Sequence, residues 1–541
     1  MALTRLTSEQ VNYTPSGTGA VTNTVQDKLN HTVSVLDFGA DPTGATDSTA
    51  AFNLATGASI AGTGFDSGTG LATDTWAKIV EVPAGQYRIT GTVYVHKGQH
   101  LRGSGQGGSR ILCTTMSAYA GPVFKLGYST IGQDSGGLPP EISGLWVYGG
   151  PQTHPVVLCD VAGYSIHDMF ITSCGDGIDM FGTDGRVENI QIDQAYGAGI
   201  NIGGHNHIVS TVMMYLPYYG FVTTNSSGAS TCSDITIDNC QIFYPQYNGI
   251  LFSGSTTHSN IRVSDCTFSL NEQFSTFQSF VETECNAAKN IIFTDCSFNN
   301  MKGPAYLHTT GIDNTVYFNG CTFSGLKTVS VYTQSTTAYA ASTKSEEVYF
   351  NDCHFKDLLD EPISVDGSTA VTRVFVFGGT YSNCTSNNLF AIGATAATGG
   401  GQLMANKVLF VDMDQQVYPA AGANAWYVAT DRPQVLTGNG ATTITQYPFG
   451  QDSVFMVDTT SAAAKVRLPR KDGVSAVKSK HGDTITFMDY NKTWDTNNVT
   501  FVAGDNSING AAAGTDYVAS TENSRITFTY NAVTDNWLVK T

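Results

Sequence analysis

The sequence repeats one pattern five times, as ITIDNCQIF (235–243), IRVSDCTFS (261–269), IIFTDCSFN (291–299), VYFNGCTFS (316–324) and VYFNDCHFK (348–356). In each copy apolar and polar residues alternate, and Asp, Asn or Gly, a cysteine, one polar residue and an aromatic residue or Ile follow. Alternation with a period of two indicates a β-strand with one buried face. The repeats therefore predict a series of equivalent strands.

A second short strand is expected after each copy, in GILFSG (249–254), QSFVET (278–283), AYLHTT (305–310), VSVYTQ (329–334) and PISVDG (362–367). Each repeat contains one cysteine, and these cysteines and one further cysteine are 26, 30, 25, 32 and 31 residues apart in turn: Cys240, Cys266, Cys296, Cys321, Cys353 and Cys384. Strands that recur at such a period, without a helical pattern between them, indicate stacked β-coils. We predict an all-β chain whose main part is a right-handed parallel β-helix of about thirteen coils.

The repeated cysteines are expected to face inward and to stack on one another as small apolar side chains. An Asp or Asn one or two positions earlier is expected to cap the turn, at Asp238, Asp265, Asp295, Asn319 and Asp352. The chain has 11 cysteines, an odd number without a CxxC pair, which argues against a disulfide framework. Ligands one coil apart, without His pairs or CxxC spacing, make a poor tetrahedral site, so the cysteines are not expected to bind a metal. We expect no other metal site and no cofactor.

The composition excludes several classes of protein. The 541 residues include 57 Gly, only 13% are charged, and the net charge is −18. So many aromatic and so few charged residues argue against disorder, and the negative charge disfavours nucleic acid as the main partner. No apolar run is long enough for a membrane span, and the first ten residues lack the apolar core of a Sec signal peptide.

The segment VSVLDFGADPTGATDSTAAF (33–52) is informative about the start of the coils. Asp47 and Ser48 are good N-caps for a helix over Thr49–Ile60, which would cover the open first coil. LDFGADPTGATDSTAAF resembles the N-terminal motif of pectate-lyase-like β-helix proteins. LTSEQVNYTPSGTGAVTNTVQDKL (6–29) is similar to the leader of bacteriophage tailspikes, and LRGSGQGGSRIL (101–112) resembles their Gly-rich early coil.

The resemblance implies a homotrimeric virion protein that binds and usually cleaves a bacterial surface polysaccharide such as capsule or O-antigen. It implies a place on the virion tail, release from the host by lysis, and docking to other tail or spike proteins through the leader. The expected parts are a leader (1–31), a cap with a short helix (32–77), the β-helix (78–430) and a C-terminal β-sandwich (431–541). The last part would serve trimerisation or carbohydrate binding, and the sequence leaves both roles open.

Glycoside hydrolysis needs two carboxyl groups that flank the scissile bond. Aligning the second strands places one outward column at Phe181, Gly203, Thr224, Ser253, Glu282, His308, Tyr332 and Asp366. A neighbouring outward column contains Asp179, Asn201, Val222, Leu251, Phe280 and Tyr306. We expect Glu272 and Glu282 to be the acid/base pair, Asp179 to be the reserve, and His308 to assist catalysis. A shift of one residue in the alignment would exchange inside and outside.

Aromatic residues gather in the turns before these strands, and Tyr332 lies in the outward column. An exposed aromatic rim suits sugar rings, so we predict substrate contacts at Tyr215, Tyr218, Tyr219, Tyr244, Tyr247, Phe274 and Tyr332. Two alternatives without a role in catalysis or sugar binding stay open for these residues. The tyrosines would equally suit packing between subunits of a trimer, and a surface glutamate is often only solvated.

Three functions remain in competition: a hydrolase, a lyase that acts on a uronate polymer by β-elimination, and a non-catalytic adhesin. A lyase needs a base and cations that neutralise the substrate carboxylate. Only Arg186, Arg262, Lys289 and Lys302 lie near the middle coils, which favours hydrolysis. His205 and His207 form a pair without a third ligand at a recognisable spacing, so a metal is not expected there either.

Overall fold

The computed structural model describes residues 7–29, 32–57, 79–96, 98–113, 121–127, 139–150, 154–224, 231–270, 279–300, 305–310, 314–325, 331–333, 346–358, 363–365, 372–382, 390–392, 402–411, 428–430, 434–437, 443–444, 453–468, 482, 484–502, 507–522 and 524–541. Its contacts divide the chain into two compact units, Met1–Asn286 and Ala287–Thr541, which are described separately.

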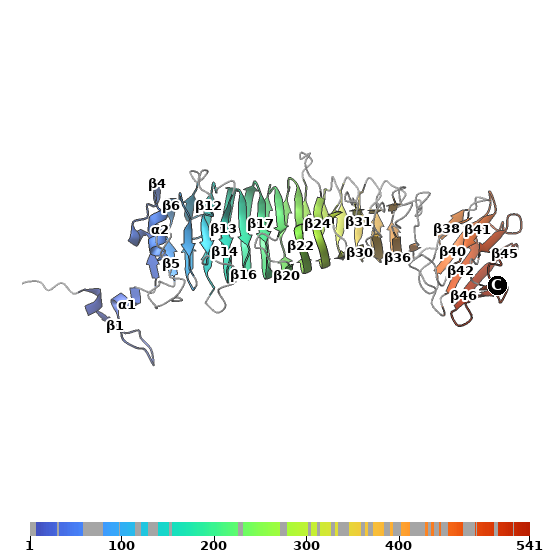
Figure 1. Cartoon of the computed structure of the whole chain (residues 1–541), viewed down its shortest axis with the longest axis horizontal. Coiled ribbons are helices and arrows are strands. Elements are labelled where there is room, and N and C mark those ends of the chain that lie inside the picture. The colour runs from blue at the N-terminus through green and yellow to red at the C-terminus, as the bar shows by residue number, and fades with distance from the viewer. Residues whose placement is uncertain are drawn as a thin grey trace, which may run out of the picture. The chain divides into compact units, whose positions relative to one another are not determined.

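The first unit consists of strands that pair in parallel from one coil to the next, and Figure 1 shows these strands side by side. One ladder contains β7 (Val93–Val95), β10 (Phe124–Leu126), β13 (Pro155–Cys159), β15 (Asp176–Met180), β17 (Ala198–Ile202), β19 (Tyr219–Thr223), β22 (Asn248–Ser264) and β24 (Ser279–Thr294). A second contains β3 (Thr32–Ser34), β5 (Ile79–Val82), β8 (His100–Gly103), β11 (Glu141–Ser143), β14 (Ala162–Cys174), β16 (Thr183–Ala195), β18 (His205–Tyr215) and β20 (Thr231–Asp238). A third contains β4 (Thr43–Asp47), β6 (Gly85–Arg88), β9 (Ser109–Leu112) and β12 (Leu145–Tyr148), and continues to β21 (Gln241–Phe243) and β23 (Thr267–Ser269).

The coils turn at single residues in the left-handed conformation, which recur every five positions along the long strands. Their φ angles lie between 49° and 60° at Asp168, Ser173, Asp184, Asn189, Gln194, Asn206, Thr211, Leu216, Asp234, Asn239 and Tyr244. Asp and Asn tolerate this conformation better than other non-glycine residues. They also bond from coil to coil, as Asn206 Nδ2 donates to Asp184 Oδ1 at 3.1 Å. Of the residues predicted to cap turns, Asp265, Asp295 and Asp352 adopt this conformation, whereas Asp238 and Asn319 end strands and the next residue, Asn239 or Gly320, forms the corner.

The cysteine ladder faces inward, as predicted. Each repeat cysteine that the structure describes follows a residue with positive φ, such as Asn239 before Cys240 and Asp265 before Cys266. None of the described cysteines forms a disulfide, and their side chains are buried at Cys113, Cys159, Cys174, Cys232, Cys240, Cys266, Cys285, Cys296, Cys321 and Cys353. Burial raises the pKa of the Cys232 thiol to about 12, so it stays protonated and packs as an apolar group. Cys384 lies outside the described residues.

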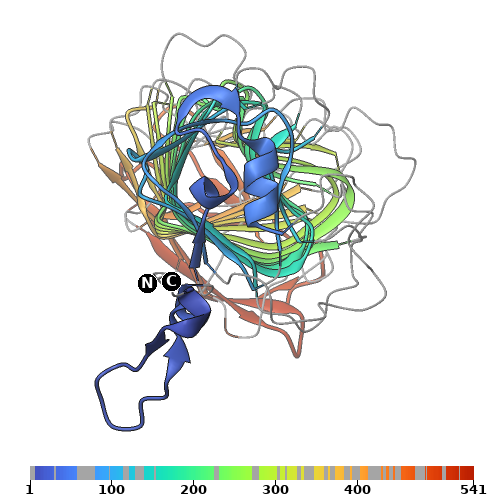
Figure 2. The same ribbon diagram turned by 90° about the vertical axis from the view of Figure 1, so that its left-hand side faces the viewer.

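The N-terminal end of the coils carries the predicted helix, α2 (Thr49–Ala55). The carboxylate of Asp47 accepts a hydrogen bond from the backbone N–H of Thr49 at 3.1 Å. Both polar atoms of the Asn53 side chain bond to the edge strand. Asn53 Nδ2 donates to the Thr92 carbonyl at 2.9 Å, and Asn53 Oδ1 accepts from the Tyr94 N–H at 3.0 Å. The helix thereby satisfies strand groups that the first coil leaves open, and Figure 2 shows it at this end.

The remaining N-terminal elements are short. They are η1 (Ser8–Gln10), β1 (Asn12–Tyr13), β2 (Asn23–Thr24), α1 (Val25–Leu29) and η2 (Val35–Phe38), and β1 and β2 pair antiparallel.

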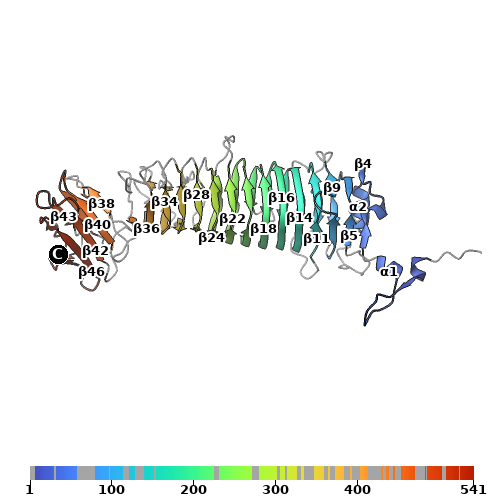
Figure 3. The ribbon, with the colours of Figure 1, turned by 180° about the vertical axis from the view of Figure 1, so that it is seen from behind.

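The second unit continues the parallel pairing in three ladders. They contain β26 (Tyr306–Thr310), β29 (Val331–Thr333), β32 (Ile363–Val365) and β35 (Phe390–Ile392); β27 (Thr315–Asn319), β30 (Glu346–Asn351), β33 (Thr372–Phe377), β36 (Gln402–Val411) and β37 (Val428–Thr430); and β25 (Ser297–Asn299), β28 (Thr322–Ser324), β31 (His354–Lys356) and β34 (Thr380–Ser382). Phenylalanines stack from coil to coil inside, as Phe318 and Phe350 do with ring centroids 5.1 Å apart. The predicted parallel β-helix is thus confirmed (Figure 3).

The C-terminal part of the second unit has two sheets. One contains β38 (Gln434–Thr437), β40 (Ser453–Asp458), β42 (Thr484–Asp489), β46 (Arg525–Asn531), β47 (Asn536–Lys540) and β44 (Ser507–Ile508); the other contains β39 (Thr443–Ile444), β41 (Ala464–Arg467), β43 (Val499–Val502) and β45 (Tyr517–Ala519). Residues of both sheets form one apolar core around Trp494, Phe501 and Phe528. A two-sheet sandwich was expected here, but its first strands pair in parallel, as β40 does with β42, and only the later ones pair antiparallel.

No helix of the described ranges is long and apolar enough to cross a membrane.

Candidate active site

The first unit presents an outward column of side chains on β15, β17, β19 and β22. The strand registers pair Asp179 with Asn201, Asn201 with Val222, and Val222 with Leu251. Their strand neighbours, such as Ile200 and Ile250, are fully buried inside the coil. The column therefore lies on the outer face, as predicted from the alternation.

Glu282 is the next member of this column and does not belong to the one predicted for it. A Cβ at Gly220 would lie 2.4 Å from the carbonyl of Gly249, its strand partner, and one at Gly249 would lie 2.7 Å from the carbonyl of Phe280. The equivalent close approach indicates that Gly249 pairs with Phe280. Two positions further along both strands, Leu251 therefore pairs with Glu282. The predicted alignment was wrong at this coil because Phe280 stands where the preceding coils have glycine. We call Asp179, Asn201, Val222, Leu251 and Glu282 the outward column.

Most of this outward column is shielded from solvent, although it points away from the coil interior. Glu282 is 4% exposed, Asp179 6%, and Val222 and Leu251 7% each. Val222 and Leu251 form an apolar cluster with Ala198, and Tyr219 packs against it. The column thus combines an apolar centre with a carboxyl group near each end.

Glu282 is held by the buried amide of Asn248. Asn248 Nδ2 donates to Glu282 Oε2 at 2.9 Å, and also to the Ser279 hydroxyl at 2.9 Å and the Ser279 carbonyl at 3.2 Å. These bonds join the start of β22 to the start of β24. They fix the position of the buried Glu282 carboxyl group, which would be costly to bury without a hydrogen-bond partner.

Three tyrosines form a compact group beside Glu282. The rings of Tyr218 and Tyr247 stack with centroids 5.5 Å apart, and Tyr219 meets Tyr218 edge-on at 4.8 Å and Tyr247 edge-on at 5.5 Å. Burial and, to a smaller extent, the neighbouring Tyr218, Tyr247, Glu282 and Glu284 together raise the pKa of Tyr219 to about 12. Tyr219 therefore stays a neutral hydroxyl group, which donates and accepts hydrogen bonds.

A second aromatic pair lies at an adjacent corner. Tyr215 and Tyr244 meet edge-on with centroids 5.3 Å apart, and Tyr215 is 41% exposed. Tyr244 adopts φ 57°, a left-handed conformation that costs a residue with a Cβ about 1–2 kcal/mol. Gln194, Thr211 and Leu216 adopt the same conformation at other corners, so it belongs to the turn of the coil and does not single out Tyr244.

Two aspartates of β15 form a second carboxyl pair. Burial raises the pKa of Asp179 well above its usual value, the charge of Asp176 raises it further, and a hydrogen bond with Asn201 opposes the shift. Burial also raises the pKa of Asp176, which accepts a hydrogen bond from the Ala198 N–H at 2.6 Å. Asp179 Oδ1 has no hydrogen-bond partner among the described residues.

Asp179 and Glu282 cannot act on one glycosidic bond. Four coil steps of about 4.8 Å separate them in the outward column, or about 19 Å, whereas acid/base pairs lie within about 9.5 Å of each other. Glu284 is better placed, because residues i and i+2 of a strand share a face at about 7 Å. Glu284 is exposed and lies in β24 with Glu282.

The other predicted site residues are only partly described. Glu272 and Phe274 lie outside the described residues, as do the side chains of His308 and Tyr332. The register pairs His308 with Thr333, and Leu307 with Tyr332, so His308 and Tyr332 do not stand opposite each other as predicted. Asn248 and Asp176 were missed, because each lies at the corner where a strand begins and the alternation gives no signal.

The comparisons with known proteins agree on carbohydrate-active β-helix proteins. Residues 32–136 match the family model described as rhamnogalacturonase A/epimerase, pectate lyase-like, which confirms the predicted resemblance for this segment. No curated protein matches the sequence.

Solved structures with a similar chain path are distant. The catalytic unit of a GH87 α-1,3-glucanase from Streptomyces thermodiastaticus is 17% identical, with 71% of this chain and 69% of that chain covered and a TM-score of 0.43. The A-module of the Azotobacter vinelandii mannuronan C-5 epimerase AlgE4 is 14% identical (73% and 100% covered, TM-score 0.48). The tailspike of E. coli bacteriophage HK620, solved with a pentasaccharide, is 12% identical (92% and 87% covered, TM-score 0.41).

Proposed function

We propose that this protein is a bacteriophage tailspike that binds a bacterial surface polysaccharide and cleaves it by glycosidic hydrolysis. One observation carries the proposal: Glu282 and Glu284 share the outer face of β24, where Glu282 is buried and Glu284 is exposed. Both glutamates lie close enough to Tyr219 and Tyr247 to raise the pKa values of these tyrosines. Aromatic rings beside two carboxyl groups are what binding and cleavage of a sugar chain require.

The two glutamates take different roles because their surroundings differ. Glu282, which is almost completely shielded from water and held by Asn248, acts as the acid and donates the proton to the leaving oxygen. The exposed Glu284 has access to water and activates it as the base. The Cα atoms of the two glutamates are about 7 Å apart along the strand. Two carboxyl groups at that separation leave room for a water molecule, so we propose inversion at the anomeric carbon. Glu272 remains the alternative partner from the sequence prediction.

Features of the outward column disfavour β-elimination. The raised pKa of Tyr219 keeps it protonated, whereas a tyrosine base must lose its proton. Arg186 and Arg262 belong to the ladder of β16, β20 and β22, where Arg186 pairs with Ile208 and Arg262 with Thr236. They are therefore not positioned along the column to neutralise a substrate carboxylate.

The test is digestion of surface polysaccharides from a panel of bacterial strains, with products identified by mass spectrometry. On a cleaved polymer we expect saturated oligosaccharides, and a loss of about 10²- to 10⁴-fold in rate for Glu282→Gln. Glu188→Gln is the matched control, because Glu188 lies on β16 beside Arg186 and away from the outward column.

Each other outcome contradicts a stated part of the proposal. Unsaturated products would show a lyase, and a bound polymer of unchanged size would show an adhesin. Activity that survives Glu282→Gln and disappears in Asp179→Asn would move the chemistry to the pair of Asp176 and Asp179.

A further inference from the structure

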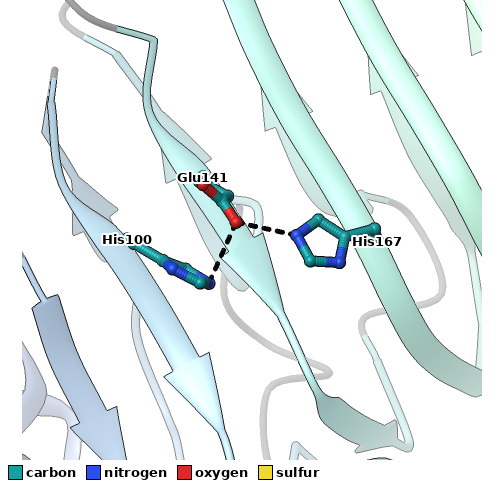
Figure 4. Close-up of side chains that lie close together, drawn as sticks. All are labelled: His100, Glu141 and His167. Carbon is teal, nitrogen blue, oxygen red and sulfur yellow. Dashed lines mark hydrogen bonds and ion pairs between the residues drawn. The ribbon is translucent and has the colours of Figure 1, made fainter.

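Two histidines and a glutamate converge on the outer face of the early coils, away from the tyrosine group. His100 lies on β8, Glu141 on β11 and His167 on β14. The registers pair His100 with Glu141, and Ser143 with His167, so the three side chains come from three successive coils. Figure 4 shows both imidazole rings directed at the Glu141 carboxylate.

The ligand atoms are already gathered. One ligand atom from each of the three residues lies within 4.8 Å of the others. Glu141 Oε1 is 2.7 Å from His167 Nε2 and 3.3 Å from His100 Nε2. A tetrahedral Zn²⁺ with bonds of about 2.0–2.1 Å needs ligand atoms about 3.3 Å apart. Glu141 Oε1 and His100 Nε2 already have this spacing. The distance between Glu141 Oε1 and His167 Nε2 must increase by about 0.6 Å.

The surroundings support the orientation of a metal ligand. His167 Nδ1 is 2.8 Å from Asp168 Oδ2, the carboxylate–histidine arrangement that fixes the ring and leaves Nε2 for a metal. The Ser143 hydroxyl lies 2.6 Å from His100 Nε2, the nitrogen that would bind the metal, so this hydroxyl must turn aside when an ion binds. Arg102, the nearest cation on β8, is bound by Glu81 at 2.6 Å, which offsets its charge. The side chains of His100, Glu141 and His167 are 20%, 35% and 29% exposed, so an ion can reach them.

We propose that His100, Glu141 and His167 bind a divalent transition metal of the Zn²⁺ type and clip three successive coils together. Two imidazoles and one carboxylate form a donor set that suits Zn²⁺ and leave a position for water. The ligands are 41 and 26 residues apart in the chain, from 100 to 141 and from 141 to 167. The expectation of no metal site was argued from the cysteine ladder and from the pair of His205 and His207, and it did not consider these three residues.

The experiment is isothermal titration of the full chain, without a histidine tag, with ZnCl₂. We expect one Zn²⁺ per chain, and binding at least tenfold weaker in His100→Ala, His167→Ala and Glu141→Gln. His205→Ala is the matched control, because His205 is an exposed histidine on β18 and is not part of this cluster; its binding should be unchanged. Titration with Co²⁺ should give the visible absorption of a tetrahedral nitrogen and oxygen site.

Thermal melting provides an independent measurement. A metal that binds only the folded chain raises Tm as its concentration rises, and the rise should be absent in His167→Ala. Far-UV circular dichroism without metal checks that each variant is folded. The proposal is overturned if the wild type binds no Zn²⁺, or if His100→Ala and His167→Ala both bind it as the wild type does, which would leave a hydrogen-bonded cluster only.

Discussion

At the scale of single residues, Asp179 shows how an outward side chain acquires unusual chemistry. It points away from the coil and yet is almost completely buried, and burial is the main cause of its raised pKa. A raised pKa in the folded state makes the free energy of unfolding depend on pH. The unfolded chain ionises Asp179 near pH 4, whereas the folded chain holds the proton to a higher pH.

The replacement Asp179→Asn tests this effect. Below about pH 4 both states of the wild type are protonated, so Tm of the variant should be close to that of the wild type. As the pH rises toward the folded-state pKa, the wild type loses stability that the variant keeps. Tm of the variant minus Tm of the wild type should therefore increase from pH 4 to pH 8 in a melting series. A difference that stays constant or shrinks would contradict the raised pKa.

At this scale the sequence predicted which side chains face outward, but it did not predict which residues they contact. Alternation correctly placed Asp179 and Glu282 outside, because the inward positions of a coil are apolar. It could not indicate that Asn248 holds Glu282, since that bond joins residues 34 positions apart. Burial of an outward carboxyl group depends on neighbouring coils, which one strand does not encode.

At the scale of elements, glycine sets how closely adjacent coils approach. A Cβ at Gly220 would lie 2.4 Å from the carbonyl of Gly249 and 3.0 Å from Ile242. The backbone must move to accept it, so Gly220→Ala should lower the free energy of unfolding by about 1–3 kcal/mol.

Gly107→Ala is the control for this substitution. Nothing lies within 4 Å of a Cβ at Gly107, and its φ is not in the left-handed region. It should change stability by less than about 0.5 kcal/mol. Equal Tm values for the two variants in thermal melts would show that the coils tolerate the methyl group and that the glycine spacing is not required.

The strands themselves were the most predictable feature. The repeated segments predicted second strands at 249–254 and 305–310, and the structure has β22 from Asn248 and β26 over Tyr306–Thr310. Register was harder, because the segments between strands differ in length and a single insertion shifts a column. That is why Glu282 entered the wrong column, and why the parallel pairing of β40 and β42 in the C-terminal part was missed.

At the scale of the whole molecule, the proposed tailspike function requires a homotrimer. Light scattering coupled to size-exclusion chromatography should give about 172 kDa, three times the 57.5 kDa of one chain. The tyrosine group would remain accessible in that trimer if it binds sugar, and Tyr247→Ala should then leave the mass unchanged. A monomer in the wild type would contradict the trimer, and a monomer in Tyr247→Ala would assign the tyrosines to subunit packing.

The parallel registers also bear on how the chain reaches its fold. Asp179 pairs with a residue 22 positions later and Val222 with one 29 positions later, and the widest register among the described residues of this unit, Thr32 with Ile79, spans 47 positions. Loops of this size close at a modest and nearly constant entropic cost. Each finished coil offers an open edge on which the next can form, so folding can advance from α2 outward while the ribosome is still delivering later coils.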